Sequence, residues 1–181
     1  MPLNVRPATL PDTAGLSDLA ARTFPLACPP DLPRQAIESF IAENLSRTAF
    51  RTYLTATGHS VLAGLDATGA IRAYALLVDG TSMDETCAGM IEGDPPVGIS
   101  KFYVDPGLHG AGAARQLLDA VVEHARADGA ASLWLATNVA NARARAFYVK
   151  SGFLERGHRV FTVGGKDNSD VVLELPLRGG A

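Results

Sequence analysis

A glycine-rich turn in the middle of the chain carries the residues best suited to chemistry. It contains Gly110 and Gly112 and lies between an apolar, strand-like run and a helix-like segment. A turn of this kind leaves several main-chain N–H groups unpaired beside the positive end of the helix dipole. Glycine has no Cβ, so a bulky anion can approach the main chain closely. The pattern therefore indicates a binding site for phosphate or pyrophosphate.

The residues that follow the turn narrow the choice of ligand. A P-loop requires a lysine followed by Ser or Thr, and this chain has Arg115 and Gln116 there. A dinucleotide-binding fingerprint requires another glycine at the position of Arg115. Both nucleotide sites are disfavoured, because each lacks a residue that its mechanism uses. A tight strand-to-helix turn without a ligand is the remaining alternative for this motif taken alone.

A second motif supplies a resemblance to a known family. The pattern Asn-x-x-Ala-x-x-Phe-Tyr-x-Lys-x-Gly-Phe runs without a gap from Asn141 to Phe153. Together with the glycine turn, it makes the chain resemble the GCN5-related N-acetyltransferase (GNAT) superfamily. The glycine turn of that superfamily has the form (Gln/Arg)-x-x-Gly-x-(Gly/Ala), which residues 109–114 match except that His109 replaces Gln or Arg.

The resemblance implies acetyl-CoA as the cosubstrate and requires no metal. It implies that main-chain amides of residues 110–115 hold the pyrophosphate, and that the strand before the turn pairs with the pantetheine arm as an added strand would. Asn141 matches a side-chain contact to the cofactor arm. The implied cofactor-binding residues are Phe102, Tyr103, Val104, His109, Gly110, Ala111, Gly112, Ala113, Ala114, Arg115, Asn141 and Tyr148.

The reaction that the resemblance implies is direct attack of an amine on the thioester carbonyl. A main-chain N–H near Val104 would stabilise the oxyanion. Tyr148 matches the tyrosine next to the thioester sulfur, and a phenol with a pKa of about 10 can protonate a thiolate with a pKa of about 8.5. We therefore predict that Tyr148 is the general acid. The alternative is a core tyrosine that follows Phe147 on an amphipathic helix.

The general base is harder to assign. Some members of the superfamily have a glutamate where this chain has Gly98, and others have one where it has Ala136. Glu92 and His59 are the remaining candidates, with Glu92 preferred, and either can act through water. The alternative is that both are solvated loop residues.

Two segments are candidates for contact with the acceptor. Acidic residues accumulate between Arg72 and Lys101, where no basic residue occurs. This segment is interpreted either as a negatively charged lid that attracts a cationic acceptor or as a soluble loop. Phe24 and Leu26 lie in a proline-rich stretch where the superfamily builds an acceptor wall; the alternative is that they close the core.

Hydrophobic periodicity predicts the elements that position these motifs. A first strand around residues 3–5 precedes a helix over 10–23, a proline-rich loop that includes Pro25, and a second helix with Ile37, Ile41 and Leu45 on one stripe. The remaining predictions are strands at 61–65, 71–78, 97–104, 132–137, 155–163 and 171–177, helices at 112–128 and 141–151, and a polar loop at 164–169.

The predicted order is β-α-α-β-β-β-α-β-α-β-β, an α/β (α+β mixed sheet) chain with a GNAT-like acyl-CoA N-acyltransferase fold. The strand-helix-strand connection from residue 97 to 137 predicts a parallel pair of strands. With 181 residues, of which 47% are hydrophobic, the chain has the size of one domain, over residues 1–177. Residues 178–181 are expected to be a frayed tail.

Composition excludes several classes of function. The net charge of −3 provides no basic field for nucleic acid. No signal-like or membrane-spanning run occurs, so we expect a cytoplasmic protein that does not bind membranes. Cys28 and Cys87 follow no metal spacing and are expected to be reduced thiols, with no metal site.

The sequence therefore predicts an N-acetyltransferase that moves an acetyl group from acetyl-CoA to a primary amine in a ternary complex. The acceptor is a small-molecule amine or a protein amine. The alternative function is a non-catalytic acyl-CoA-binding sensor, which the missing carboxylates at Gly98 and Ala136 favour and Tyr148 disfavours. Similar proteins commonly dimerise, so a homodimer is an open expectation.

Overall fold

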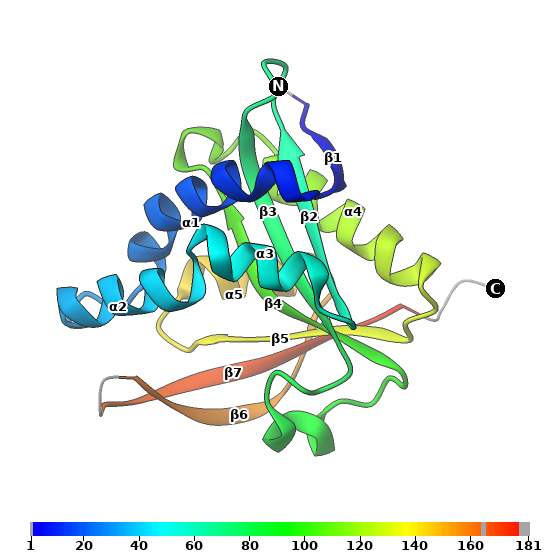
Figure 1. The fold of residues 1–181 in the computed structure, drawn as a ribbon. Helices are drawn as coiled ribbons and strands as arrows, with labels where there is room; N and C mark the ends of the chain where they lie inside the picture. The colour runs from blue at the N-terminus through cyan, green and yellow to red at the C-terminus, as the bar shows by residue number, and fades with distance from the viewer. Residues whose placement is uncertain (1, 164–165, 178–181) are drawn as a thin grey trace. The chain divides into compact units, whose positions relative to one another are not determined.

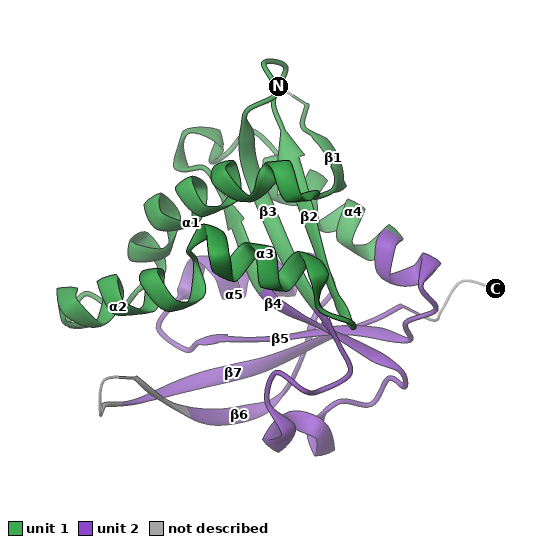
Figure 2. Cartoon of the chain, viewed as in Figure 1, with its two compact units in different colours: residues 1–77, 101–123 green, residues 78–100, 124–181 purple. Residues whose placement is uncertain are grey.

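The computed structural model describes residues 2–163 and 166–177, so the predicted tail at 178–181 lies outside it (Figure 1). The chain forms two compact units, which are coloured separately in Figure 2. Unit 1 comprises Met1–Leu77 and Lys101–Glu123, and unit 2 comprises Val78–Ser100 and His124–Ala181. The single domain expected over residues 1–177 stays a prediction.

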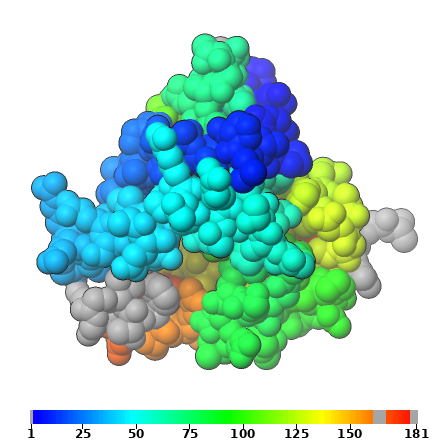
Figure 3. Space-filling model, in the orientation of Figure 1, coloured from blue at the N-terminus to red at the C-terminus, as the bar shows by residue number. Residues whose placement is uncertain are grey.

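Unit 1 begins with a strand and three α-helices. Strand β1 (Asn4–Pro7) is followed by the 3-10 turn η1 (Leu10–Asp12) and by α1 (Thr13–Ala27), α2 (Arg34–Asn44) and α3 (Arg47–Thr55). Strand β2 (His59–Leu65) pairs antiparallel with β1. In the space-filling view, blue and cyan atoms mark the surface that these helices form on unit 1 (Figure 3).

The start of α1 agrees with the sequence, but its end does not. The main-chain N–H of Thr9 donates to the Asp12 carboxylate at 2.7 Å, which secures the first turn as the predicted capping residues require. The helix then continues through Pro25 to Ala27, so the prediction that Pro25 belongs to the loop is wrong. Proline removes one hydrogen bond without ending the helix here, since it lies in the last turn.

The structure also contains a helix that the predicted order lacks. Leu45, which was predicted to lie on the stripe of the second helix, follows the last residue of α2, and the Ser46 hydroxyl then accepts a hydrogen bond from the Ala49 N–H at 3.2 Å and starts α3. The observed order is therefore β-α-α-α-β-β-β-α-β-α-β-β, counting strands and α-helices. On α3, Phe50 is fully buried and belongs to the core of unit 1.

Two strands and one helix continue from one unit into the other. Strand β3 (Ile71–Asp79) and strand β4 (Pro96–Val104) lead to the short turn η3 (Pro106–Leu108) and to α4 (Ala113–Ala127). Residues 101–104 of β4, the glycine turn and most of α4 belong to unit 1. The predicted bounds of these elements are correct to within a residue or two.

Unit 2 contains η2 (Glu85–Met90), β5 (Ser132–Asn138), α5 (Ala142–Lys150), β6 (Leu154–Val163) and β7 (Lys166–Pro176). Strand β4 pairs parallel with β5, as predicted, with Pro96 opposite Ser132. Trp134, Cys87 and Val172 form a buried cluster, against which Met83 and Met90 pack. Both cysteines of the chain are free, as expected.

The hairpin of β6 and β7 is longer than predicted. Residues 166–169 of the expected polar loop belong to β7, where Ser169 pairs with Val160. The sequence did not predict this part of β7 because its residues are polar. An exposed strand need not show the alternation of apolar and polar residues by which strands are recognised. Residues 164 and 165 lie outside the described residues.

The strands hydrogen-bond in the order β1-β2-β3-β4-β5-β7-β6, which makes a mixed seven-stranded sheet. The predicted fold class is thereby confirmed. Over the described ranges, no helix combines the length and apolar character needed to span a bilayer.

Candidate active site

The glycine turn of unit 1 has the backbone conformation that glycine favours. Gly110 and Gly112 adopt φ angles of 82° and 78°, in the left-handed region that other residues rarely occupy. No atom of the described residues lies within 4 Å of where a Cβ of Gly110 would stand. The first turn of α4, all of which the structure describes, contains no acidic residue. The turn therefore leaves the N-terminal N–H groups of α4 accessible to an anion.

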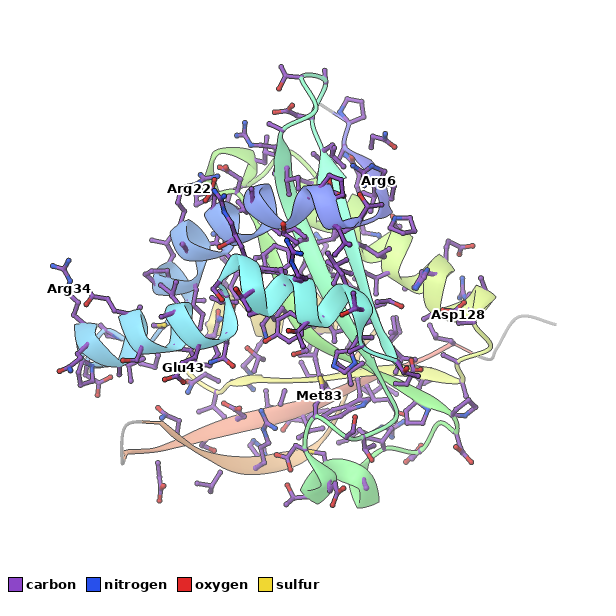
Figure 4. The ribbon with its side chains drawn as sticks, in the orientation of Figure 1. Arg6, Arg22, Arg34, Glu43, Met83 and Asp128 are labelled. Carbon is purple, nitrogen blue, oxygen red and sulfur yellow. The ribbon has the colours of Figure 1, made fainter. Side chains whose placement is uncertain are left out.

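Asp105, which the sequence did not single out, holds the loop before the turn in place. Its Oδ1 accepts a hydrogen bond from the Gly107 N–H at 2.9 Å, and its Oδ2 lies 3.1 Å from Arg22 and 3.2 Å from Arg72. Figure 4 labels Arg22 on α1. Burial raises the pKa of Asp105, but the Gly107 N–H and the two arginines outweigh it and leave the pKa lowered. The Asp-Pro-Gly triplet was the available signal, since it is typical of a tight turn.

The other predicted cofactor residues of unit 1 follow one another along the chain. Phe102, Tyr103 and Val104 form the end of β4 and are partly buried, whereas His109 is exposed at the end of η3. Arg115 is exposed and pairs with Asp119 at 2.8 Å. Gln116 has a structural contact, because its Oε1 accepts a hydrogen bond from the Leu3 N–H at 2.6 Å.

Unit 1 also contains a cluster of aromatic side chains around Lys101, which we call the tyrosine cluster. The Tyr74 ring stacks on Tyr103 at 5.6 Å and meets Phe50 edge-on at 5.4 Å. The Lys101 ammonium lies 5.1 Å from the centre of the Tyr53 ring. The members of the cluster are Phe50, Tyr53, His59, Tyr74, Lys101 and Tyr103. The sequence analysis did not identify this cluster, although it named His59 and Tyr103 separately.

The two residues of the predicted acceptor wall, Phe24 and Leu26, differ in how far they are packed against the fold. Phe24 stacks on Phe40 with ring centroids 4.4 Å apart, while Leu26 is 67% exposed. Phe24 therefore packs between α1 and α2, as the core alternative expects. Leu26 remains available to a ligand, and its role in an acceptor wall stays a prediction.

The second motif places Asn141 and Tyr148 on α5, in unit 2. Asn141 caps the helix, because its Oδ1 accepts a hydrogen bond from the Ala144 N–H at 3.1 Å. Tyr148 is 7% exposed, and its ring contacts Phe147 and Phe153, each at 5.2 Å. These edge-on contacts fix the ring, so that the phenol has a defined position.

Glu92, the preferred candidate base, belongs to an ion-pair network of unit 2. Its carboxylate lies 2.9 Å from Arg156, which also lies 2.7 Å from Glu174. Glu174 is fully buried and accepts hydrogen bonds from the main-chain N–H groups of Glu92 and Gly93. A similar pairing joins Arg159 to Asp84 and Asp170. The acidic segment is thus fastened to the β6–β7 hairpin by two arginines.

Of the two positions where other superfamily members have a glutamate, Gly98 has no space for a side chain in this arrangement. A Cβ on Gly98 would collide with Met83, which Figure 4 labels, and would lie 3.1 Å from the Trp134 indole nitrogen. Ala136 packs against the Trp134 cluster. The missing carboxylate at Gly98 therefore has a steric reason. In the described parts of the chain, no three His, Cys, Asp or Glu side chains are grouped so as to hold a metal ion.

The predicted site residues are thus distributed over both units. Unit 1 carries Phe102, Tyr103, Val104 and the glycine turn; unit 2 carries Glu92, Asn141 and Tyr148.

Comparison with known proteins identifies the relatives of this chain. Residues 30–153 match the model of the acetyltransferase (GNAT) family. An uncharacterized N-acetyltransferase of Mycobacterium tuberculosis is 39% identical over 166 residues, which cover 92% of this chain and 98% of that protein. Among solved structures, the PaiA N-acetyltransferase of Thermoplasma acidophilum in complex with coenzyme A has a TM-score of 0.76 at 17% identity, covering 97% of this chain and 99% of that one. Arabidopsis thaliana NAA60 in complex with acetyl-CoA has a TM-score of 0.74 at 14% identity, covering 98% and 99%.

Proposed function

The chain belongs to the acetyltransferase (GNAT) family, and we propose that it transfers an acetyl group from acetyl-CoA to a primary amine in a ternary complex. The observation that carries the proposal is the glycine turn. Its positive φ angles, open surface and helix start without an acidic residue suit a pyrophosphate group. Acetyl-CoA contributes an activated thioester, and the chain contributes binding, orientation and proton transfer.

The residues of the turn and of β4 would bind the donor. The N–H groups from Gly110 to Arg115 would hold the pyrophosphate, since the start of α4 leaves such groups unpaired, except that the Ala111 N–H donates to the Leu108 carbonyl at 3.1 Å. The main chain of Phe102, Tyr103 and Val104 would pair with the pantetheine arm. For Asn141 we propose contact through the amide nitrogen, because its Oδ1 is engaged in capping α5.

Two groups would act during the transfer itself. The acceptor amine attacks the thioester carbonyl, the C–S bond breaks, and the sulfur leaves as a thiol once protonated. We propose that a main-chain N–H near Val104 stabilises the oxyanion and that the Tyr148 hydroxyl donates the proton to sulfur. The contacts of Tyr148 with Phe147 and Phe153 support this role, because a general acid must be held in one place.

We retain Glu92 as the candidate base for the proton of the amine. Its side chain is 72% exposed, so water can reach it. Its ion pair with Arg156 opposes this role, because the carboxylate already has a cationic partner at 2.9 Å. The alternative base, His59, is a member of the tyrosine cluster.

A direct test combines binding and turnover. We expect calorimetry to detect acetyl-CoA binding and a thiol-release assay on a panel of amines to detect turnover. Replacement Tyr148→Phe should lower kcat about 100-fold and leave acetyl-CoA affinity unchanged, because it removes one proton donor from a packed ring. Equal kcat for the wild type and Tyr148→Phe would contradict the assignment of the acid.

The second candidate function, a non-catalytic acyl-CoA sensor, is favoured by the steric exclusion of a glutamate at Gly98. Tight acetyl-CoA binding without turnover on any amine would select it. A homodimer and a cytoplasmic location stay predictions.

A further inference from the structure

Lys101 is a cation without an anionic partner among the described residues of its own chain. It lies on β4, partly buried, with its ammonium 5.1 Å from the centre of the Tyr53 ring. Among the ion pairs of the described residues, none involves Lys101. Burial lowers its pKa to about 8, so the ammonium predominates at neutral pH. The face of the Tyr53 ring compensates for only a part of the hydration that the Lys101 ammonium loses on burial.

Tyr74 adds an unsatisfied hydrogen-bonding group to the same cluster. The side chain is fully buried, and its hydroxyl has no hydrogen-bond partner in the described chain. A buried hydroxyl without a partner carries a desolvation cost that a ligand can relieve. Burial, followed by the nearby phenols of Tyr103 and Tyr53, raises its pKa. The hydroxyl therefore stays neutral and can donate a hydrogen bond.

The charge of the tyrosine cluster indicates the ligand. The Lys101 ammonium and the unpaired Tyr74 hydroxyl together match an anion of single charge. A phosphate dianion would leave excess negative charge among aromatic side chains, which is costly away from water. A carboxylate satisfies both groups and leaves no net charge.

The cluster is also placed on the strand proposed to bind the donor. Lys101 and Tyr103 alternate with Phe102 along β4, whose main chain would pair with the pantetheine arm. An acceptor bound at Lys101 would therefore lie along the same strand as the donor.

We propose that Lys101 and the Tyr74 hydroxyl bind the carboxylate of the acceptor, so that the substrate is a free amino acid acetylated on its amine. This inference rests on the proposed function, whose acceptor it specifies. Peptide N-termini and polyamines lack the adjacent carboxylate and would be poor substrates.

Kinetics on matched acceptors test the inference. We expect the wild type to acetylate amino acids at least about tenfold more efficiently, in kcat/KM, than the corresponding amino-acid amides. Lys101→Met should lower kcat/KM for the best amino acid about 30-fold, mainly through KM, and leave its amide unchanged. Tyr74→Phe should have a smaller effect in the same direction. Arg51→Met, which removes an exposed cation from α3, is the matched control.

A binding measurement separates this role from that of a general base. The N-acetylated form of the best amino acid with a non-ionising side chain has no titratable group between pH 7 and 9.5, so its affinity reports on the protein. Besides Lys101, the titratable groups of the cluster and its surroundings are Tyr53, His59, Tyr74, Tyr103 and Cys28. Burial raises the pKa of the three tyrosines and of Cys28. We expect calorimetric affinity to fall about tenfold as Lys101 loses its proton over this range, and the fall to be absent in Lys101→Met.

Three results would overturn the inference: equal efficiency with amino acids and their amides, no amino acid acetylated at all, or a kcat that Lys101→Met lowers equally for both. The last would identify Lys101 as a general base. If acetyl-CoA itself did not bind, the proposed function would fail. If it bound and amides reacted as well as acids, only the inference would fail.

Discussion

Lys101 in unit 1 and Glu174 in unit 2 are both charged side chains, the first partly buried and the second fully buried, but their surroundings differ. Glu174 is fully buried, and Arg156 and the N–H groups of Glu92 and Gly93 surround its carboxylate. The Lys101 ammonium instead lies over the face of the Tyr53 ring. A buried charge that its own chain satisfies stabilises the fold, whereas one without such partners is costly unless something else binds it. The comparison separates a structural ion pair from a candidate binding group.

The same comparison explains the acidic segment. Burial raises the pKa of Glu174, but the Gly93 N–H, the Glu92 N–H and Arg156 outweigh it and leave the pKa lowered. This carboxylate therefore stays ionised and holds the segment to β7. Asp84 is likewise paired, with Arg159 at 2.6 Å. Asp84 and Glu92, two of the acids that suggested a cationic acceptor, thus have arginine partners, which favours a structural role for them.

The largest expected effect is the loss of the Glu174 carboxylate. Replacement Glu174→Ala leaves Arg156 and two N–H groups without their buried partner, and should lower the free energy of unfolding by about 3–5 kcal/mol. Urea unfolding at pH 7 measures the change. Glu155→Ala, on the exposed side of β6, is the control. A loss below about 1 kcal/mol would show that the network is not structural.

Replacement Lys101→Met should change the free energy of unfolding in the opposite direction, and by a smaller amount. The folded pKa of about 8 lies below the ordinary value of 10.5, so between these values the unfolded chain binds more protons and stability rises with pH. Below pH 8 the folded state bears the cost of the buried ammonium. We expect the methionine variant to be more stable than the wild type by about 1–2 kcal/mol at pH 7, after discounting for partial exposure, and to lack the rise between pH 8 and 10.5.

Urea unfolding of both proteins at pH 7 and pH 10 tests this expectation. If the free energy of unfolding of the wild type did not change over this range, or if Lys101→Met were less stable than the wild type, the Lys101 ammonium would already have adequate partners within the fold.

The smallest stability effect is expected for Glu92→Gln. Its exposed ion pair contributes less than about 1 kcal/mol, so unfolding should hardly change. If Glu92 is the base, kcat should fall about 100-fold. An unchanged kcat would leave Glu92 as a member of the Arg156 network alone.

The features that the sequence could predict are those that depend on neighbouring residues. The glycine turn and the Asn141 cap are local, because a positive φ at Gly112 and a helix start each require a particular residue type at one position. The parallel pairing of β4 and β5 followed from their connection through a helix. These local rules were enough for the fold class and the family.

The tyrosine cluster and the Glu174 network required the fold itself. Gly93 and Glu174 lie 81 positions apart, and no local pattern joins them. Lys101 likewise resembles an ordinary polar residue of an alternating strand, because only the fold places the Tyr53 ring beside it. Helix α3 was missed because a single residue, Ser46, separates it from the preceding stripe of apolar residues.

The central claim is that the glycine turn of unit 1 binds acetyl-CoA, and calorimetry on Gly112→Glu tests it most directly. The new carboxylate would repel the pyrophosphate, and its backbone would be strained at a φ of 78°. Gly89→Glu is the matched control, because a Cβ at that position would have no described atom within 4 Å apart from its chain neighbours. We predict that Gly112→Glu weakens acetyl-CoA binding at least about 100-fold while Gly89→Glu binds like the wild type. Unchanged affinity in a folded Gly112→Glu protein would contradict the claim.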